Sequence, residues 1–445
     1  MAKYQKYVEY KDSDVEWLGE IPSHWSAKRL GSFFEERREK VSDVDYTALS
    51  VTKNGIVPQL DTAAKTDAGD NRKLVKVNDF VINSRSDRKG SSGVSPYTGS
   101  VSLISIVMEP RRIYPAYAHH LLRSYPFQEE FYRYGKGIVA DLWSTNSSEM
   151  KNILLPDLPI AEQQNIANFL DHETAKIDTL IAKQEKLIEL LKEKRQAVIS
   201  LAVTKGLNPN VTMKDSGVEW LGEVPEHWEK KILKYIVSQQ GGGTPDKSNL
   251  SFWDGDIPWV SPKDMKVDYI STSQDKITVQ AIEQSSTKLV PIGSVLMVVR
   301  GMILIHSVPV ALTKEALTIN QDMKALIPNK LLNSEYFLYL LKGLKDYLLD
   351  YVETSGHGTK CLRSDDFMNM PLFLPDVEEQ KNIVEYIKIK SKKFDSLTDK
   401  AESAIQLMKE RRTALISAAV TGKIDVRHWQ SPNKNNNQNN MELSA

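Results

Sequence analysis

The sequence has only one cysteine among its 445 residues, Cys361, so it can form no internal disulfide and no zinc site made of thiolates alone. It also lacks any run of about 18 consecutive apolar residues, the length that a membrane-spanning helix needs. Its first residues, MAKYQKYVEYKDSD, contain no apolar core of a secretory signal. These absences predict a cytoplasmic protein with no membrane association.

Several motifs of enzymes are also missing. There is no phosphate-binding loop of the form GxxxxGK(S/T), and no GxGxxG follows a candidate strand, so neither ATP hydrolysis nor a dinucleotide-binding fold is indicated. The absence of any Pro-Pro dipeptide excludes the Asn/Asp-Pro-Pro-aromatic tetrapeptide with which adenine methyltransferases grip a flipped base. We therefore expect no catalytic group, no bound cofactor and no metal site in this chain.

The sequence has no excess charge of either sign, with 58 Lys and Arg against 58 Asp and Glu. Its two presumptive globular segments are equally balanced: residues 31–155 hold 17 basic and 15 acidic side chains, and residues 234–375 hold 14 and 15. Non-specific affinity for DNA comes mainly from the release of counterions at phosphates. We therefore expect that neither segment binds DNA strongly by charge alone.

What the sequence does contain is an internal repeat. Residues 12–30, DSDVEWLGEIPSHWSAKRL, match residues 215–233, DSGVEWLGEVPEHWEKKIL, at 13 of 19 positions. A second pair joins residues 155–204 to residues 374–421, and a fainter one joins Lys73–Arg85 to Lys288–Arg300. The chain is therefore two copies of one unit, each with a short Trp motif, a globular segment and a long helix.

Each copy ends in a segment of about 40 residues with helical periodicity, which corresponds to a helix of about 60 Å. Such a stripe needs a partner, and we expect the two helices to pack antiparallel as a coiled coil; the alternative is that each packs on its own globular segment. Asp376 and Glu379 have the spacing of a capping box at the start of a helix. Gly206 and Gly422 follow the predicted helix ends, where glycine is favoured as a C-cap. The apolar positions are Ile166, Leu170, Ile177, Leu180, Leu187, Leu191, Val198 and Leu201, then Ile383, Ile387, Phe394, Leu397, Ala401, Ala404, Met408, Leu415 and Ala418.

The predicted fold class is α+β: two mixed α/β domains joined by two long antiparallel helices, with an internal pseudo-twofold repeat. Residues 74–81 and 290–299 look like strands, and residues 117–134 and 334–351 look like amphipathic helices. The predicted divisions are an N-terminal Trp segment 1–30, domain 31–157, central helix 158–206, linker and second Trp segment 207–233, domain 234–375, distal helix 376–425 and a disordered Asn-rich tail 426–445.

Three features together resemble one family. They are the duplicated VEWLGEIPSHW and VEWLGEVPEHW elements, the LP…EQ start of two long helices ending in AVT, and the string GGGTP…FWDGDIPWVSPKDM at residues 241–265. With these features the chain resembles the specificity subunit of type I restriction-modification systems over its whole length except the tail. The first globular segment lacks the GGGTP string and has a different amino-acid sequence at residues 33–55.

The resemblance implies a function. Each globular segment would be a target-recognition domain that reads one half of a split, asymmetric sequence in double-stranded DNA, and the helices would be spacers that fix the distance between them. The spacers would also dock two modification subunits, which are adenine-N6 methyltransferases that use S-adenosylmethionine. Restriction subunits using ATP and Mg²⁺ would join this core, and the chain itself would carry no catalytic group. We expect an insertion of one helical repeat near residues 206–211 to lengthen the gap between half-sites.

The candidate DNA contacts lie in loops and at strand ends. Arg can donate two hydrogen bonds to guanine and Asn can pair with adenine, whereas Lys and bare glycine N–H groups suit phosphates. The alternatives are a solvated strand-end arginine and a plain flexible turn. The candidates are Arg72, Lys73, Asn83, Arg85, Arg88, Lys89 and Lys136, and in the second segment Gly242, Gly243, Thr244, Lys263, Arg300, His357 and Lys360.

A smaller set of residues is a candidate for subunit docking or for the spacer. Trp17 and Trp220 belong to the Trp repeat and either pack within the fold or meet a partner. Gln184, Lys194 and Arg411 break the apolar stripe, and they either set the register of the helices or face a partner subunit. A rival function of another class is a stand-alone regulator that binds a split DNA site.

Overall fold

The computed structural model describes residues 4–59, 69–137 and 143–430 and places them in two compact units. Unit 1 comprises residues 1–185 and 403–445, and unit 2 comprises residues 186–402. Within the described residues, no helix is both long enough and apolar enough to cross a bilayer. The predicted disordered tail 426–445 is wrong at its start, because Val426 is buried in the core of unit 1 and Trp429 packs on Phe169; the tail from residue 431 lies outside the described residues.

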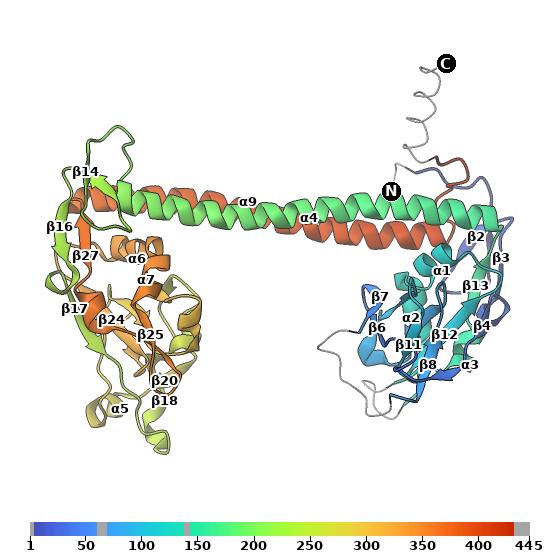
Figure 1. The fold of residues 1–445 in the computed structure, drawn as a ribbon, viewed down its shortest axis with the longest axis horizontal. Helices are drawn as coiled ribbons and strands as arrows, with labels where there is room; N and C mark the ends of the chain where they lie inside the picture. Colours follow the sequence, from blue (N-terminus) through green and yellow to red (C-terminus); the bar gives the residue numbers. More distant parts are fainter. Residues whose placement is uncertain (1–3, 60–68, 138–142, 431–445) are drawn as a thin grey trace. The chain divides into compact units, whose positions relative to one another are not determined.

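Unit 1 is built on a four-stranded antiparallel sheet in the order β10-β9-β12-β4, with a smaller sheet β11-β8-β5 and the hairpin β6-β7 beside it (Figure 1). Its strands are β1 Tyr10–Asp12, β2 Glu20–Pro22, β3 Ser26–Arg29, β4 Phe34–Glu36, β5 Lys40–Val41, β6 Leu49–Thr52, β7 Gly55–Pro58, β8 Arg72–Val75, β9 Phe80–Asn83, β10 Ser92–Val94, β11 Gly99–Val101, β12 Ser105–Pro110 and β13 Leu154–Asp157. Its shorter helices are η1 Leu30–Ser32, η2 Ser86–Arg88, α1 Pro115–Leu121, α2 Tyr125–Arg133 and α3 Ser147–Asn152.

Unit 2 repeats this plan with a five-stranded sheet in the order β17-β24-β21-β22-β19 and a smaller sheet β20-β18-β23. Its strands are β14 Met213–Asp215, β15 Glu223–Pro225, β16 Glu229–Ile232, β17 Val237–Gly241, β18 Trp253–Val260, β19 Tyr269–Ile270, β20 Asp275–Ile277, β21 Val295–Val298, β22 Val310–Thr313, β23 Thr318–Ile319, β24 Met323–Pro328, β25 Val352–Thr354, β26 Lys360–Leu362 and β27 Pro371–Leu374. Its shorter helices are η4 Leu233–Tyr235, η5 Leu250–Phe252, η6 Pro262–Asp264, η7 Met302–Ile305, η8 Leu349–Tyr351, α5 Val279–Gln284, α6 Ser334–Gly343, α7 Lys345–Leu348 and α8 Ser364–Met368.

The same strand pairings frame the Trp motif in both units. The motif forms a small antiparallel hairpin, β1-β2 in unit 1 and β14-β15 in unit 2. The next strand, β3 or β16, pairs with the strand that precedes a long helix, β13 or β27. The two ends of each globular segment are therefore held together beside the start of its helix.

The long helices are α4, Ile160–Lys205, and α9, Val377–Val420. In unit 1 the first part of α4 shares a buried apolar cluster with the last part of α9, and in unit 2 the last part of α4 shares one with the first part of α9. Ion pairs bridge the two helices within each unit: Arg412 to Asp178 at 2.9 Å in unit 1, and Arg195 to Asp395 at 2.6 Å in unit 2. These contacts and the mixed sheets confirm the predicted α+β class with paired antiparallel helices.

Several predicted elements differ from the observed ones. The predicted strand 74–81 is two strands, β8 and β9, because the chain turns at Asn78, which has a φ of 73°. The predicted strand 290–299 is confined to β21, because Gly293 turns the chain before it. Each predicted amphipathic helix is also broken, the first before Pro126, which cannot continue the ladder of α1.

Candidate nucleic-acid interface

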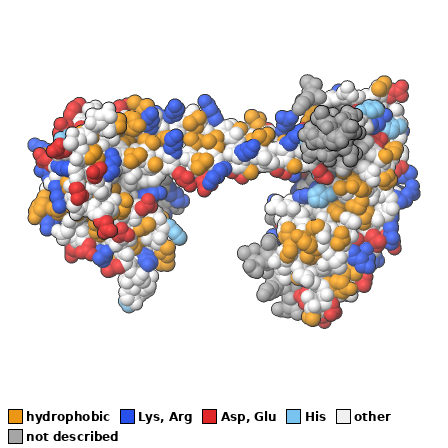
Figure 2. All heavy atoms as spheres, turned by 45° about the horizontal axis from the view of Figure 1, so that its top comes forward, with side chains coloured by type: hydrophobic (Ala, Val, Ile, Leu, Met, Phe, Trp, Pro, Cys, Tyr) orange, Lys and Arg blue, Asp and Glu red, His pale blue; other side chains and the backbone are white. Residues whose placement is uncertain are grey.

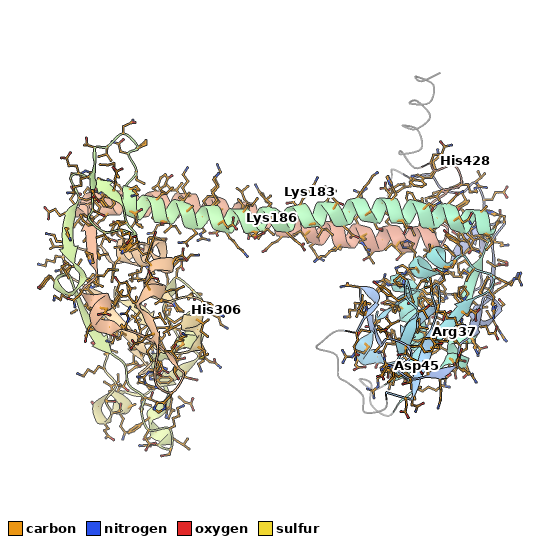
Figure 3. All side chains as sticks on the ribbon, in the orientation of Figure 1. Arg37, Asp45, Lys183, Lys186, His306 and His428 are labelled. Carbon is orange, nitrogen blue, oxygen red and sulfur yellow. The ribbon has the colours of Figure 1, made fainter. Side chains whose placement is uncertain are left out.

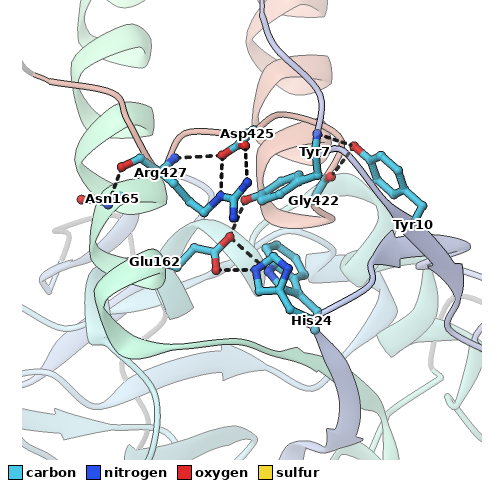
Figure 4. Close-up of polar contacts among 9 residues, drawn as sticks. Tyr7, Tyr10, His24, Glu162, Asn165, Gly422, Asp425 and Arg427 are labelled. Atoms are coloured by element: carbon cyan, nitrogen blue, oxygen red, sulfur yellow. Dashed lines mark hydrogen bonds and ion pairs between the residues drawn. The ribbon is translucent and has the colours of Figure 1, made fainter.

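A buried carboxylate ties the Trp hairpin of unit 1 to the start of α4 (Figure 4). Glu162 lies in the first turn of the helix, and its side chain is 5% exposed. Its Oε1 accepts a hydrogen bond from the indole of Trp25 at 3.1 Å and from the hydroxyl of Tyr7 at 2.5 Å, while Oε2 lies 2.9 Å from Nε2 of His24. Burial and the adjacent Glu162 raise the pKa of Tyr7, so its hydroxyl keeps its proton and donates.

Unit 2 has an equivalent contact between a glutamate and its Trp hairpin at the start of α9; in both units we call this contact the Trp clasp. The indole of Trp228 donates to Glu379 at 3.3 Å, and Nε2 of His227 lies 2.8 Å from the same carboxylate. Glu379 is 30% exposed, and among the described residues no tyrosine hydroxyl donates to it as Tyr7 does to Glu162. The capping-box prediction was half right: the N–H of Glu379 donates to Asp376, but the Glu379 side chain turns to the Trp hairpin instead of returning to the cap.

The glutamine that follows each of these glutamates holds the globular domain to the long helix. Gln163 accepts the backbone N–H of Tyr114 at 2.8 Å, and Gln380 accepts that of Asn333 at 2.8 Å. Both glutamines are buried, and each also donates to a backbone carbonyl just before its own helix. Tyr114 and Asn333 are the N-caps of α1 and α6, so the duplicated Glu-Gln pair fixes two neighbours of the helix start at once.

The C-terminal ends of the long helices are held in the same way. Lys205, the last residue of α4, donates to the carbonyl of Glu223, and Lys423 after α9 donates to that of Glu20, the equivalent of Glu223 in the repeat. Gly206 and Gly422 adopt left-handed backbone conformations with φ of 76° and 74°, which confirms the predicted C-caps.

A buried tyrosine on each globular domain reaches the C-terminal end of the other long helix. The hydroxyl of Tyr117 in α1 donates to the carbonyl of Val420, and that of Tyr336 in α6 donates to the carbonyl of Val203, both at 3.3 Å. Each globular domain is therefore fixed to the start of one helix and the end of the other. This frame presents the loops of each domain on a rigid support.

In unit 1 the structure brings two predicted DNA contacts together. Ser144 bridges Arg85 and Lys136, with the N–H of Lys136 donating to the Ser144 carbonyl at 3.1 Å. Arg85 is exposed, and its guanidinium has no polar partner among the described residues. Lys136 is paired with Glu149 at 2.6 Å.

Unit 2 has the same arrangement at the equivalent strand end. Arg300 bridges Cys361, and the N–H of Gly301 donates to the carbonyl of Lys360 at 3.0 Å. Arg300 is exposed, and its guanidinium also lacks a partner in the part of the chain that the structure describes. His357 is exposed on the same β25-β26 hairpin, while Lys360 donates to Thr354 at 2.7 Å.

Three predicted contacts of unit 1 serve the fold instead. Arg72 is 6% exposed and donates to the hydroxyl and carbonyl of Ser100, and Lys73 donates to the carbonyl of Ser105 at 2.7 Å. Burial lowers the pKa of both cations. Asn83 is buried and accepts the N–H of Arg85. These positions argue against direct DNA contacts by Arg72, Lys73 and Asn83.

The glycine turn of unit 2 is also a packing feature. A Cβ on Gly242 would lie 1.9 Å from the carbonyl oxygen of Asn320, so only glycine fits there. The N–H of Gly243 donates to Ile319, which leaves it unavailable to a phosphate. Thr244 donates its hydroxyl to Gln321. The predicted phosphate-binding role of this turn therefore conflicts with its hydrogen bonds.

The remaining predicted cations are exposed but paired. Lys89 pairs with Glu129, and Lys263 pairs with Asp275 at 2.6 Å. Arg88 lies 3.6 Å from Asp87, a loose contact. Figure 2 shows basic and acidic side chains interspersed over the visible face of each unit. Phosphates would have to displace carboxylates from these cations, which limits their contribution to affinity.

The candidate docking residues divide into two kinds. Trp17 packs edge-on against Phe127, and Trp220 packs on Tyr347 with ring centroids 4.6 Å apart, so both are half-buried in the fold. Lys194 and Arg411 are exposed on the long helices, and Gln184 is half-buried. Sequence reasoning missed the clasp residues Glu162, Gln163, Glu379 and Gln380, although the duplicated Glu-Gln pair was a visible signal for them.

Comparisons with known proteins agree with this architecture. A family model described as "Type I restriction modification DNA specificity domain" matches residues 225–406. The chain is similar to the specificity subunit of the type I restriction enzyme EcoR124I/EcoR124II of Escherichia coli, with 32% identity over 288 residues, which are 64% of each protein. It is 30% identical to the MjaIX specificity subunit of Methanocaldococcus jannaschii over 43% of each chain. The similarity thus spans less than two thirds of either relative.

Solved structures extend the likeness to nearly the whole chain. One, reported under "Structural basis underlying complex assembly and conformational transition of the type I R-M system", superposes with a TM-score of 0.65 and 18% identity, covering 91% of this chain and 99% of the other. The HsdS subunit from Thermoanaerobacter tengcongensis gives a TM-score of 0.55 at 18% identity, covering 91% and 98%. At these identities the likeness supports the fold.

Proposed function

Because this chain belongs to the family of type I restriction-modification specificity subunits, we propose that it selects the DNA target of such a complex. The target is a bipartite, asymmetric sequence in double-stranded DNA, with one half-site for each recognition domain. The chain contributes recognition and assembly, while the chemistry belongs to other subunits.

One observation carries the proposal. Arg85 and Arg300 occupy equivalent strand ends in the two units, and each is exposed, without a polar partner among the described residues, and next to a loop that holds a lysine. An unpaired arginine on a rigid strand end can donate two hydrogen bonds to O6 and N7 of guanine. Two such groups in one chain, surrounded by dissimilar loops, suit two different half-sites.

The Trp hairpins and the long helices are similar in both units, so they suit partners that bind both units in the same way. Two modification subunits, carrying S-adenosylmethionine, would dock on the repeated Trp hairpins and on the paired helices, where Leu180, Leu187 and Leu201 are exposed. Restriction subunits, carrying ATP and Mg²⁺, would join the assembly. This chain would bind none of these cofactors itself.

The test is to map methyladenine by single-molecule sequencing in a host that expresses the chain with its modification subunit. We expect one bipartite motif. Arg85→Ala should relax one half of it and Arg300→Ala the other, each by about 1–3 kcal/mol of discrimination. Arg112→Ala, which removes an exposed arginine in the segment before α1, serves as the control and should leave the motif unchanged.

Two results would contradict the proposal. A motif that is continuous, or that changes in both halves when one arginine is replaced, would refute one domain per half-site. If no methyltransferase co-purifies with the chain and DNA binding persists, the stand-alone regulator becomes the better account.

A further inference from the structure

The short turn η7 in unit 2 exposes three apolar side chains directly after Arg300. Met302 is 60% exposed, Ile303 43% and Ile305 45%, whereas Leu304 between them is buried. His306, labelled in Figure 3, follows the turn and is exposed as well. Apolar side chains gathered at one exposed turn call for a binding partner.

This turn is held firmly in place. The N–H of Gly301 donates to Lys360, that of Leu304 to Gly301 at 3.2 Å, and that of His306 to Ile303 at 3.1 Å. Gly301 has a φ of 134°, a conformation that suits glycine. Because Leu304 anchors the turn in the core, the three exposed side chains stand in a defined geometry beside Arg300.

Unit 1 also has a short turn after its strand-end arginine, but this turn carries charged side chains instead of apolar ones. There, η2 follows Arg85, and Asp87 and Arg88 stand where unit 2 has Met302 and Ile303. The exposed apolar side chain joined to this turn is Trp143, which comes from another loop and accepts the N–H of Ser86 on its carbonyl at 2.8 Å. A short helical turn thus follows the strand-end arginine in both units, but η7 starts one residue later than η2, and the side chains of the two turns differ.

The difference in side chains indicates whether the turn contacts DNA or a partner subunit. Partners shared by the two units would require the same side chains twice, as the Trp clasps provide. Different half-sites require different side chains on the same support. The one apolar group that a base presents in the major groove is the C5-methyl of thymine.

We propose that η7 reads thymine: Met302, Ile303 and Ile305 contact a thymine methyl group next to the guanine bound by Arg300. This inference rests on the proposed function and deepens it for the half-site of unit 2. The exposed Arg300 beside the turn, with the half-buried Lys360 next to it, supplies the attraction to DNA that apolar side chains lack.

The experiment uses the full chain assembled with its modification subunit and duplexes that carry the mapped target. Each thymine of the unit 2 half-site is replaced in turn by uracil, which removes only the methyl group. We expect one replacement to weaken binding about four-fold, the value for one buried methyl group. The triple variant Met302→Ser, Ile303→Ser, Ile305→Ser should bind thymine and uracil duplexes equally.

A matched control replaces exposed apolar residues of the same unit outside the turn. The double variant Ile292→Ser, Leu331→Ser should retain the four-fold preference, because both residues are exposed but lie away from η7 in the sequence. Circular dichroism confirms that each variant is folded. Replacement of thymines in the unit 1 half-site should leave the response of the triple variant the same as that of the wild type.

Several results would overturn the inference. They are a unit 2 half-site without an A·T pair, equal binding of every uracil duplex by the wild type, and loss of the modification subunit from the triple variant, which would make η7 a protein contact. A DNA bend that depends on η7 without a thymine preference would identify a wedge between base steps instead. If Arg300→Ala also leaves the motif unchanged, the proposed function itself fails; if it relaxes the motif, only the thymine inference fails.

Discussion

A single carboxylate anchors each Trp hairpin, and the two copies differ in burial. Glu162 is buried under Tyr7 and accepts from two donors, whereas Glu379 is partly exposed and accepts from one indole. We expect Glu162→Gln to lower the free energy of unfolding by about 2–3 kcal/mol, because an amide cannot replace charge-assisted hydrogen bonds to two donors. Urea denaturation followed by tryptophan fluorescence measures the loss.

Glu379→Gln is the matched control for that substitution. Water can satisfy the groups around a carboxylate that is 30% exposed, so its loss should be about 1 kcal/mol. Equal losses in the two variants would show that burial does not govern the strength of the clasp.

His119 in α1 makes unit 1 sensitive to acid. Burial, then the neighbouring Arg123, lowers the pKa of His119 to about 3, and Arg123 lies 2.6 Å from its Nε2. The unfolded chain takes up this proton near pH 6.5 and the folded chain does not, so the stabilisation is complete above about pH 6.5 and is lost as the pH falls toward 3. His119→Gln should therefore flatten the decline of stability between pH 7 and 5, measured by urea denaturation at each pH.

The exposed His357 provides the comparison, since His357→Gln should leave that decline unchanged. A decline that is identical in wild type and His119→Gln would contradict the assigned protonation of His119.

At the residue scale, the sequence indicated which residue types could contact DNA, but it did not indicate which of them are exposed to solvent. The strand-end arginines, Arg85 and Arg300, were found from the repeat and are exposed and unpaired within the described residues. Arg72 was chosen for its charge and neighbours, but it is buried because Ser100 of the adjacent strand receives its guanidinium. Whether a cation faces solvent depends on which strand pairs beside it, and local sequence does not contain that pairing.

At the element scale, the two helix C-caps offer a direct comparison. Both glycines have positive φ, so alanine should cost about 1–2 kcal/mol at either position. A Cβ on Gly422 would lie 2.4 Å from Cδ of Pro22, whereas one on Gly206 has no neighbour closer than 3.4 Å. Gly422→Ala should therefore destabilise by about 1–3 kcal/mol more than Gly206→Ala. Thermal denaturation of both variants tests this difference, and equal shifts would contradict it.

The two long helices were predicted more reliably than the strands and the shorter helices, for a physical reason. The long helices carry an apolar stripe over many turns, and that periodicity persists whatever packs on them. The strands are short, and turns at Asn78 and Gly293 divide runs that look continuous. The apolar stripe is less completely buried than its sequence suggests, because Leu180, Leu187 and Leu201 stay about half exposed.

At the scale of the whole molecule, the contacts that occur in both units lie in the supporting frame, whereas the side chains that differ lie in the exposed turns. Glu162 and Glu379 each bind the Trp and His of their own hairpin, and the hydrogen bonds of Tyr117 and Tyr336 and the ion pairs of Arg412 and Arg195 also occur in equivalent pairs. The turns η2 and η7 occur twice with different side chains. The repeated contacts form the same frame in both units, and under the proposed function the different side chains at the two turns would give the two half-sites different specificities.

If the proposed function holds, the two long helices should set the spacing of the half-sites. Helix α4 ends at Lys205, so residues 206–211 lie in the connection that follows it, and an insertion meant to lengthen the spacer belongs inside the helices. Seven residues added to both, after Glu185 and after Glu402, keep the heptad phase and add about 10 Å, the length of about three base pairs. We expect methyladenine mapping to find both half-sites unchanged with a longer gap. We also expect slower methylation, because three base pairs turn the second half-site by about 100° around the DNA axis. Seven residues inserted after Pro209 should leave the gap as it was, and altered bases in either half-site would refute the spacer as a ruler.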